Sequence, residues 1–159
     1  MSKTDLDKLR KIIQEARTAM FTTHDWQNRL VSRPMAVLEL DDAGSVWFFT
    51  RKDSAVGEQI ERNDQVNLSF QHGGQFLSVS GKGAYVDDPA KSKQLWSSLY
   101  RAWFPKGIDD PELQLMRVDV AQAEYWESSE SLVPVVYAAL KATVTGQEAE
   151  MGVHGEVRA

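Results

Sequence analysis

Residues that could bind an anionic ligand gather between positions 32 and 54 of the sequence. Residues 32–50, SRPMAVLELDDAGSVWFFT, contain an apolar run, a polar break at Asp41-Asp42-Ala43-Gly44 and an aromatic run, a pattern that predicts one β-hairpin. Arg33 stands at the start of its first strand, and Thr50 closes its second. A fixed cation and a hydroxyl donor beside apolar walls could bind a flat ligand with an anionic tail. An ordinary pair of barrel strands is the alternative.

A phosphate is one anion that this segment could bind. Basic and hydroxyl residues cluster at the predicted strand ends: Arg33, Thr50, Arg51, Lys52 and Ser54. Phosphates are bound by a guanidinium or ammonium together with hydroxyl and backbone donors, best of all at a helix N-terminus. Residues 50–54 run from a predicted strand end to a predicted helix start, which offers that arrangement. These residues could also be solvated loop charges, and spacing alone favours that alternative.

The tryptophans allow a similar pair of interpretations. Most of them belong to the apolar pattern, so core packing is the first interpretation for Trp47, Trp96, Trp103 and Trp126. An aromatic side chain near the end of a sheet could instead stack on a planar heterocycle. The residues alone therefore predict a barrel that could hold an anionic planar ligand, and they go no further.

Other chemistry has little support in the sequence. The histidines have predicted positions in a turn, a hairpin loop and a tail, without a partner at metal-binding spacing: His24, His72 and His154. The chain has no cysteine and no G-x-S-x-G motif, which argues against a nucleophilic triad. Three acidic pairs fall at turns or helix starts, where capping explains them: Asp41-Asp42, Asp87-Asp88 and Asp109-Asp110. We predict no metal site and no paired-carboxylate catalysis.

Composition limits the class of protein. The 159 residues suit one domain, and 18 basic against 23 acidic residues give a formal charge of −5. That balance argues against general binding to nucleic acid or to an anionic membrane. The sequence shows no secretory signal and no apolar run near the roughly 20 residues that span a bilayer. Since the absence of cysteine suits a reducing compartment, we expect a soluble, cytoplasmic protein.

Periodicity predicts the elements that position these residues. Helical spacing predicts an amphipathic helix over residues 4–17, a short helix capped by Asp53, a helix over 89–102 capped by Asp88, and a last helix near 132–142. Strand patterns lie near residues 20–23, 29–40, 45–50, 66–71, 75–86, 115–120 and 124–127. Gly81 and Gly83 suggest a sharp bend in a barrel strand. We predict one α+β domain over residues 1–145, an antiparallel barrel with peripheral helices, and a flexible tail over 146–159.

The order of several short motifs resembles the pyridoxamine 5′-phosphate oxidase-like split barrels. The motifs are Thr22-Thr23, Ser32-Arg33-Pro34-Met35 and Trp47-Phe48-Phe49-Thr50. Two later segments are similar to the general stress protein 26 branch of that family: Ala102-Trp103-Phe104-Pro105, with Gly107 and Asp110-Pro111 downstream, and Ala123-Glu124-Tyr125-Trp126. The resemblance covers about residues 5–142.

This resemblance implies a six-stranded antiparallel split β-barrel, usually a homodimer, that binds FMN at the subunit interface. FAD is possible as well. The positions that match the family's cofactor site are Arg33 on the first strand of the predicted hairpin, Phe49 and Thr50 at the end of the second, and Lys52 and Ser54 after it. Two further matches, Trp103 and Trp126, are aromatic positions of the branch.

The chain also departs from the oxidases proper. They have an Arg-Lys pair where this chain has Ala55-Val56, a lysine at or near Leu38, and a glutamine near Phe76. Because polar contacts are missing, oxidation of vitamin B6 is not expected. The leading hypothesis is an FMN-dependent oxidoreductase, whose hydride or electron transfer occurs at flavin N5. The alternatives are a non-enzymatic flavin-binding stress-response module and an interaction protein with a vestigial pocket.

Overall fold

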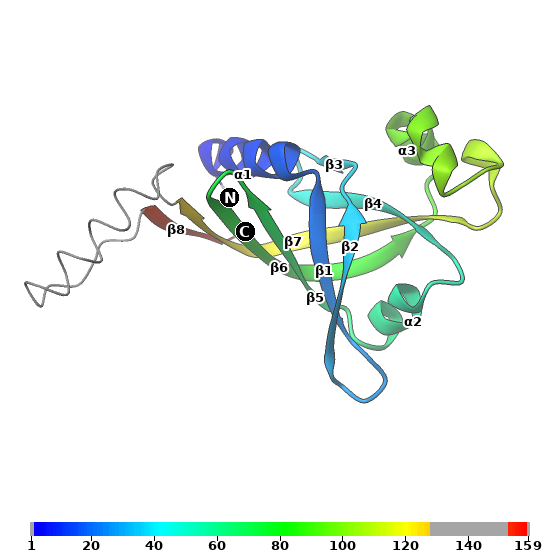
Figure 1. Cartoon of the computed structure of the whole chain (residues 1–159), viewed down its shortest axis with the longest axis horizontal. Helices are drawn as coiled ribbons and strands as arrows, with labels where there is room; N and C mark the ends of the chain where they lie inside the picture. The colour runs from blue at the N-terminus through cyan, green and yellow to red at the C-terminus, as the bar shows by residue number, and fades with distance from the viewer. Residues whose placement is uncertain (1, 128–152, 159) are drawn as a thin grey trace, which may run out of the picture.

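The chain forms one strongly curled antiparallel sheet with helices around it (Figure 1). The structure is a computed structural model that describes residues 2–127 and 153–158. Its helices are α1 (Lys3–Ala16), α2 (Ala55–Arg62) and α3 (Pro89–Leu95), with 3-10 turns at Ser98–Ala102 and Gly107–Asp109. Its strands are β1 (Thr18–His24), β2 (Leu30–Ala36), β3 (Glu39–Leu40), β4 (Ser45–Arg51), β5 (Gln65–His72), β6 (Gln75–Val86), β7 (Leu113–Glu127) and β8 (Val153–Arg158).

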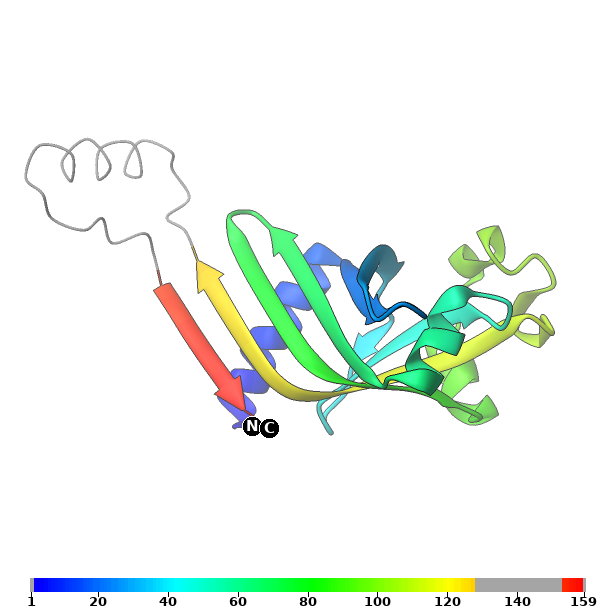
Figure 2. The same cartoon turned by 90° about the horizontal axis from the view of Figure 1, so that it is seen from below.

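The order of the strands explains the curl. Hydrogen-bonded neighbours follow the order β2-β1-β5-β6-β7-β4-β3, so β2 and β3 occupy opposite ends of the sheet. In the chain, however, only Val37 and Leu38 separate these two strands. The sheet therefore has to curl until its two ends lie close together. Figure 2 shows how strongly the long strand β7 (yellow) bends. This is the split-barrel architecture, and the predicted α+β fold class is confirmed.

The predicted hairpin over residues 32–50 is wrong in its pairing. β2 pairs with β1 along its whole length, from Thr18 opposite Ala36 to His24 opposite Leu30, and not with β4. Only β3 and the preceding Leu38, whose N–H donates to the Trp47 carbonyl at 2.9 Å, reach β4. The polar break does form a tight turn, in which Asp41 accepts from the N–H groups of Ala43 and Ser45. The local turn signal was correct, but the alternating pattern of β2 fits either neighbour.

Over the described residues, the sheet has eight strands rather than six. The predicted strand 29–40 is divided into β2 and β3, and the two strands predicted over 115–127 are one continuous strand, β7. A β-bulge at Ala121 causes the second difference, since Val120 lies opposite Gly81 and Gln122 lies opposite Ser80. One extra residue reverses the in–out alternation, so the pattern resembles two strands.

The other differences lie at helix ends and at the C-terminus. α2 is preceded by Ser54 as its N-cap, not Asp53, whose carboxylate instead binds the Arg51 guanidinium at 2.9 Å. Asp88 caps α3 as predicted, but this helix ends at Leu95. The helix predicted near 132–142 lies outside the described residues. Within the predicted flexible tail, Val153–Arg158 form β8, which covers the edge of β7 beyond the part that pairs with β4.

The core lies inside the curl of the sheet. Phe21 of β1 meets Phe48 of β4 edge-to-face, with ring centroids 5.3 Å apart, and both side chains are fully buried. α1 packs against β3, β5 and β6 and contributes Leu9 and Ile12 to the same cluster. α2 packs against β1 and β6. These contacts anchor the strands that carry the candidate site.

The close approach of β6 and β7 at the bulge leaves no room for a side chain at Gly81. A Cβ atom there would lie 2.3 Å from the Asp119 carbonyl oxygen, and backbone cannot easily move away. We expect Gly81→Ala to lower the free energy of unfolding by about 1–3 kcal/mol in urea denaturation. The exposed neighbour provides the control, Ser80→Ala, which should change it by less than about 0.5 kcal/mol. Equal effects of the two substitutions would contradict the tight approach.

Candidate functional site

A cavity of about 680 Å³ lies where β2 and β4 diverge. Its walls come from β2 (33–36), Leu38, the end of β4 (49–51), the start of α2 (54–56), and the segment after α3, through Tyr100, Trp103 and Phe104. The two strands that the sequence predicted as a paired hairpin therefore form opposite walls of an opening. The same residues come together, but around a cavity rather than as hydrogen-bonded strands.

Arg33 is held in the cavity wall by a ring of hydrogen bonds. Its Nη1 donates to the Thr23 hydroxyl at 2.6 Å and its Nη2 donates to Gln59 Oε1 at 2.8 Å. The Thr23 hydroxyl in turn donates to the same Gln59 oxygen at 2.6 Å. A longer contact of 3.4 Å joins Nη1 to the Phe21 carbonyl. Strands β1 and β2 and helix α2 thus fix one guanidinium.

None of these partners carries a charge. Within the described part of the chain, Arg33 has no carboxylate partner, and burial lowers its pKa from the usual arginine value. A guanidinium remains protonated in proteins, so the cavity wall carries a positive charge that its contacts do not compensate. Arg51, which also lines the cavity, differs, because its guanidinium lies 2.9 Å from Asp53.

Two hydroxyls and a helix start lie on the same cavity. Thr50 Oγ1 and Ser54 Oγ are 3.0 Å apart, and both residues line the cavity. Ser54 precedes α2 as its N-cap residue, but its side chain makes no capping hydrogen bond to the first N–H groups of the helix. Helix N-termini favour anions through these N–H groups and through the helix dipole. Arg33, the hydroxyl pair and the start of α2 together suit a phosphate.

The other side of the cavity is aromatic. Phe49 contacts Trp96, Tyr100 and Phe104, with ring centroids 5.9, 5.6 and 6.3 Å away. Trp103 lines the cavity and is 61% exposed, so much of its side chain is accessible to a ligand. A smaller cavity of about 470 Å³ adjoins the first and shares Thr18, Ala36, Leu38 and Tyr100 with it. The site has a positively charged end, an aromatic wall and adjoining space.

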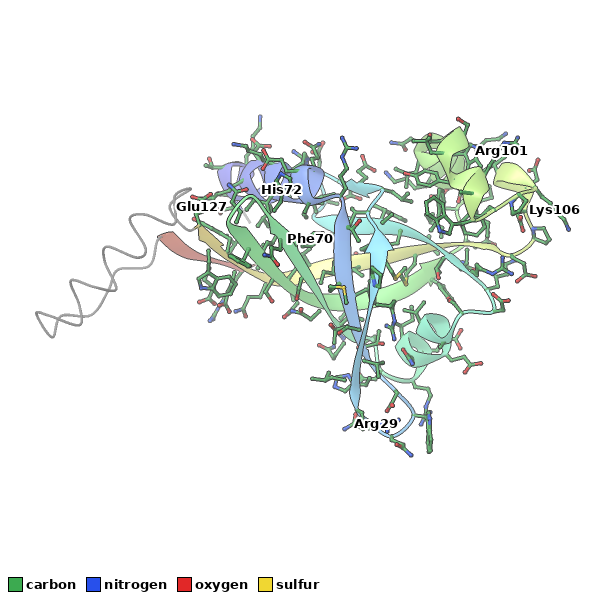
Figure 3. All side chains as sticks on the ribbon, in the orientation of Figure 1. Arg29, Phe70, His72, Arg101, Lys106 and Glu127 are labelled. Carbon is green, nitrogen blue, oxygen red and sulfur yellow. The ribbon has the colours of Figure 1, made fainter. Side chains whose placement is uncertain are left out.

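The structure brings together five of the seven residues that the resemblance implied: Arg33, Phe49, Thr50, Ser54 and Trp103 line the cavity. Lys52 does not line it; its side chain is exposed and its N–H donates to the Glu112 carbonyl at 2.9 Å. Trp126 lies opposite Phe76, beside Glu127. In Figure 3, Glu127 lies at the other end of the molecule from Arg101 and Lys106, which lie near Trp103 in the chain.

Sequence reasoning missed Thr23 and Gln59. Thr23 matched a motif only by its position, and Gln59 carries no local signal, because its contact depends on α2 packing against β1. The acidic pairs do have the expected local roles: Asp88 accepts from the Lys91 N–H at 2.9 Å and Asp110 from the Glu112 N–H at 3.0 Å. Among residues 2–127 and 153–158, no group of acidic and histidine side chains could hold a metal ion. No helix in these ranges is long and apolar enough to cross a membrane.

Comparisons with known proteins identify relatives over most of the chain. The family model described as "Pyridoxamine 5'-phosphate oxidase like" matches residues 4–150. Protein bli-3 of Neurospora crassa is 26% identical over 156 residues, which cover 91% of this chain and 75% of that protein.

Solved structures have the same fold. The general stress FMN/FAD binding protein from Xanthomonas citri is 32% identical and superposes with a TM-score of 0.71, over 82% of this chain and 93% of that one. A general stress protein 26 from Jannaschia sp. CCS1 is 23% identical with a TM-score of 0.72, over 98% and 99% of the two chains. The second likeness supports the fold alone.

The hydrogen-bond ring makes Thr23 important for stability. Thr23→Val keeps the shape but leaves an Arg33 N–H and one acceptor position of Gln59 without their partner in a buried place. We expect the free energy of unfolding in urea to fall by about 1–3 kcal/mol. Thr22→Val is the control, since Thr22 pairs with Ser32 at an exposed position, and it should cost less than about 0.5 kcal/mol. A loss for Thr23→Val no larger than the control's would show that the ring does not stabilise the fold.

Proposed function

The chain belongs to the pyridoxamine 5′-phosphate oxidase-like family, and from that premise we propose that it is a flavin-binding protein of the general stress type. The observation that carries the proposal is the uncompensated guanidinium of Arg33 in a cavity that also has an aromatic wall. The relative from Xanthomonas citri, described as an FMN/FAD binding protein, supports the same ligand class.

The residues of the cavity fit FMN. Its volume of about 680 Å³ lies within the ~300–1,000 Å³ of typical ligand pockets. Arg33, Thr50, Ser54 and the start of α2 would hold the terminal phosphate, which is the most highly charged part of the molecule. Phe49, Tyr100 and Trp103 would border the ring and exclude water from it. We propose FMN rather than FAD because the site has one uncompensated cation and one hydroxyl pair, which match one phosphate.

We propose an oxidoreductase as the leading function. Bound flavin supplies hydride or electron transfer at N5, and the protein supplies orientation and a dry site. The adjoining cavity of about 470 Å³ could hold a second reactant beside the flavin. Oxidation of vitamin B6 is not proposed, because Leu38, Ala55 and Val56 line the cavity where the oxidases have cationic side chains.

A non-enzymatic flavin-binding module is the second candidate. One observation favours it: among the described residues, no histidine, aspartate or glutamate lines the larger cavity, which leaves the Tyr100 hydroxyl as its candidate general acid. Stopped-flow reduction of the bound flavin by a nicotinamide dinucleotide, followed by reoxidation with an added acceptor, separates the two. Repeated turnover supports the oxidoreductase, and a flavin that is not reduced supports the passive module.

We also propose a homodimer formed through the outer face of the sheet. This face carries exposed apolar side chains on several strands: Met20 on β1, Leu30 on β2, Phe76 on β6 and Trp126 on β7. Exposed apolar groups of this kind mark protein interfaces. A second copy on this face could bring its own Trp126 to the cavity, which would account for the match of Trp126 to the family's aromatic position.

FMN binding tests the proposed site directly. The protein mixed with FMN should co-elute with a yellow band in gel filtration, and Arg33→Ala should weaken FMN binding by about 1.5–3 kcal/mol in a fluorescence titration. Arg62→Ala is the control, because Arg62 is exposed at the end of α2 and does not line the cavity. A wild-type protein that elutes colourless and leaves FMN fluorescence unchanged would refute the proposal.

Light scattering tests the dimer. We expect a mass of two copies for the 17.9 kDa wild type and of one copy for Trp126→Glu, because burying a carboxylate in an apolar interface is costly. Trp26→Glu is the matched control, since Trp26 is 69% exposed in the turn between β1 and β2. If Trp126→Glu remains dimeric and Trp26→Glu does not, the interface lies elsewhere.

A further inference from the structure

We propose that Gln59 is a positioning residue that makes the cavity selective for a phosphorylated flavin, because it holds Arg33 with an oxygen that carries no charge. The proposal rests on the proposed flavin binding and adds the residue that determines selectivity. It concerns a side chain that lies behind Arg33 and is not among the residues that line the cavity.

The direction of every hydrogen bond in the ring follows from chemistry. A guanidinium only donates, so the Thr23 hydroxyl accepts from Arg33 and has its own hydrogen left to donate. That hydrogen goes to Gln59 Oε1, which also accepts from Arg33 Nη2. The amide oxygen of Gln59 therefore faces both donors, and its NH2 group must point away. This arrangement fixes the orientation of Arg33 without adding a negative charge.

Most arginines that make side-chain contacts in the described chain are held differently. Arg10, Arg29, Arg51, Arg117 and Arg158 each lie 2.7–2.9 Å from a carboxylate oxygen. Two of the three Arg33 contacts, at 2.6 and 2.8 Å, are similarly short, and all three are to neutral oxygens. The charge of Arg33 thus remains available to a ligand.

The hydrogen bonds to Thr23 and Gln59 also leave two N–H groups of Arg33 free to bind a ligand. Of the five N–H groups of a guanidinium, Nη1 uses two, on Thr23 and Phe21, and Nη2 uses one, on Gln59. Nε–H and the second Nη2–H have no partner among the described residues. Two adjacent N–H groups can bind two oxygens of one phosphate in parallel, which is the strongest mode of arginine–phosphate recognition.

A glutamate at this position would have nearly the same shape and the opposite effect on binding. It would place a full negative charge where Oε1 now lies, 2.8 Å from Nη2, and would compensate Arg33 before any ligand arrives. The cavity has no substitute cation in its described wall, since Arg51 is paired with Asp53 and positions 55 and 56 are Ala and Val. Selectivity for a phosphate would then be lost, although the ring of contacts would persist.

The test compares FMN with riboflavin, which has the same ring and no phosphate. We expect Gln59→Glu to weaken FMN binding about 10–100-fold and riboflavin binding less than about 3-fold, with an equal or higher melting temperature. Gln27→Glu, at the exposed turn between β1 and β2, adds the same charge away from the cavity and should leave both affinities unchanged within about 3-fold. A structural role alone would not change the ratio of the two affinities.

A second variant keeps the proposal open to refutation if Gln59→Glu does not fold. Gln59→Met removes the oxygen at similar length, and we expect the FMN-to-riboflavin affinity ratio to fall about 3–10-fold, because Arg33 is no longer held in place. Wild-type ratios in the variants that fold would overturn the proposal and leave flavin binding intact. A wild-type protein that binds neither flavin would overturn the proposed function and, with it, this inference.

Discussion

Two residues, Val37 and Leu38, connect the opposite ends of one sheet, and the rest of the architecture follows from this short link. Their N–H groups bind outward in both directions, Val37 to the Arg17 carbonyl beside β1 and Leu38 to the Trp47 carbonyl of β4. A link of this length allows no flat sheet, because the ends must come within a few residues' reach of each other. The strands diverge on one side of the link, and the opening between them becomes the cavity.

The chemistry of the cavity depends on the residues behind its wall, Thr23 and Gln59, which hold Arg33 in place. Arg33 lies in an edge strand, where a single side chain could adopt many rotamers. Thr23 from β1 and Gln59 from α2 restrict it, and they do so with neutral oxygens in a place where burial disfavours the charged form. The free protein therefore retains an electrostatic cost in its cavity wall, and a bound anion relieves that cost. The proposed affinity for an anion and a small loss of stability in the free state would then have the same origin.

Features that depend on neighbouring residues could be predicted from the sequence. The turn at Asp41, the cap at Asp88 and the alternation of β5 are local, and together with the ordered motifs they were enough for the fold class. Features that depend on distant contacts could not. The alternating pattern of β2 does not specify its partner, the bulge at Ala121 is defined only by the register against β6, and nothing near Gln59 indicates that α2 brings it to Arg33.

This chain lacks the Arg-Lys pair of the oxidases, and Thr23 and Gln59, which hold Arg33, are therefore more important here. With Ala55 and Val56 at the start of α2, an anion in the cavity meets one full positive charge and the partial charge of a helix N-terminus, instead of several cations. A site with many cations tolerates one compensating carboxylate, but a site with one cation does not. On the proposed function, the neutral oxygen of Gln59 is therefore as much a condition for anion binding as Arg33 itself, and α2 contributes to the proposed site through both its first turn and its side.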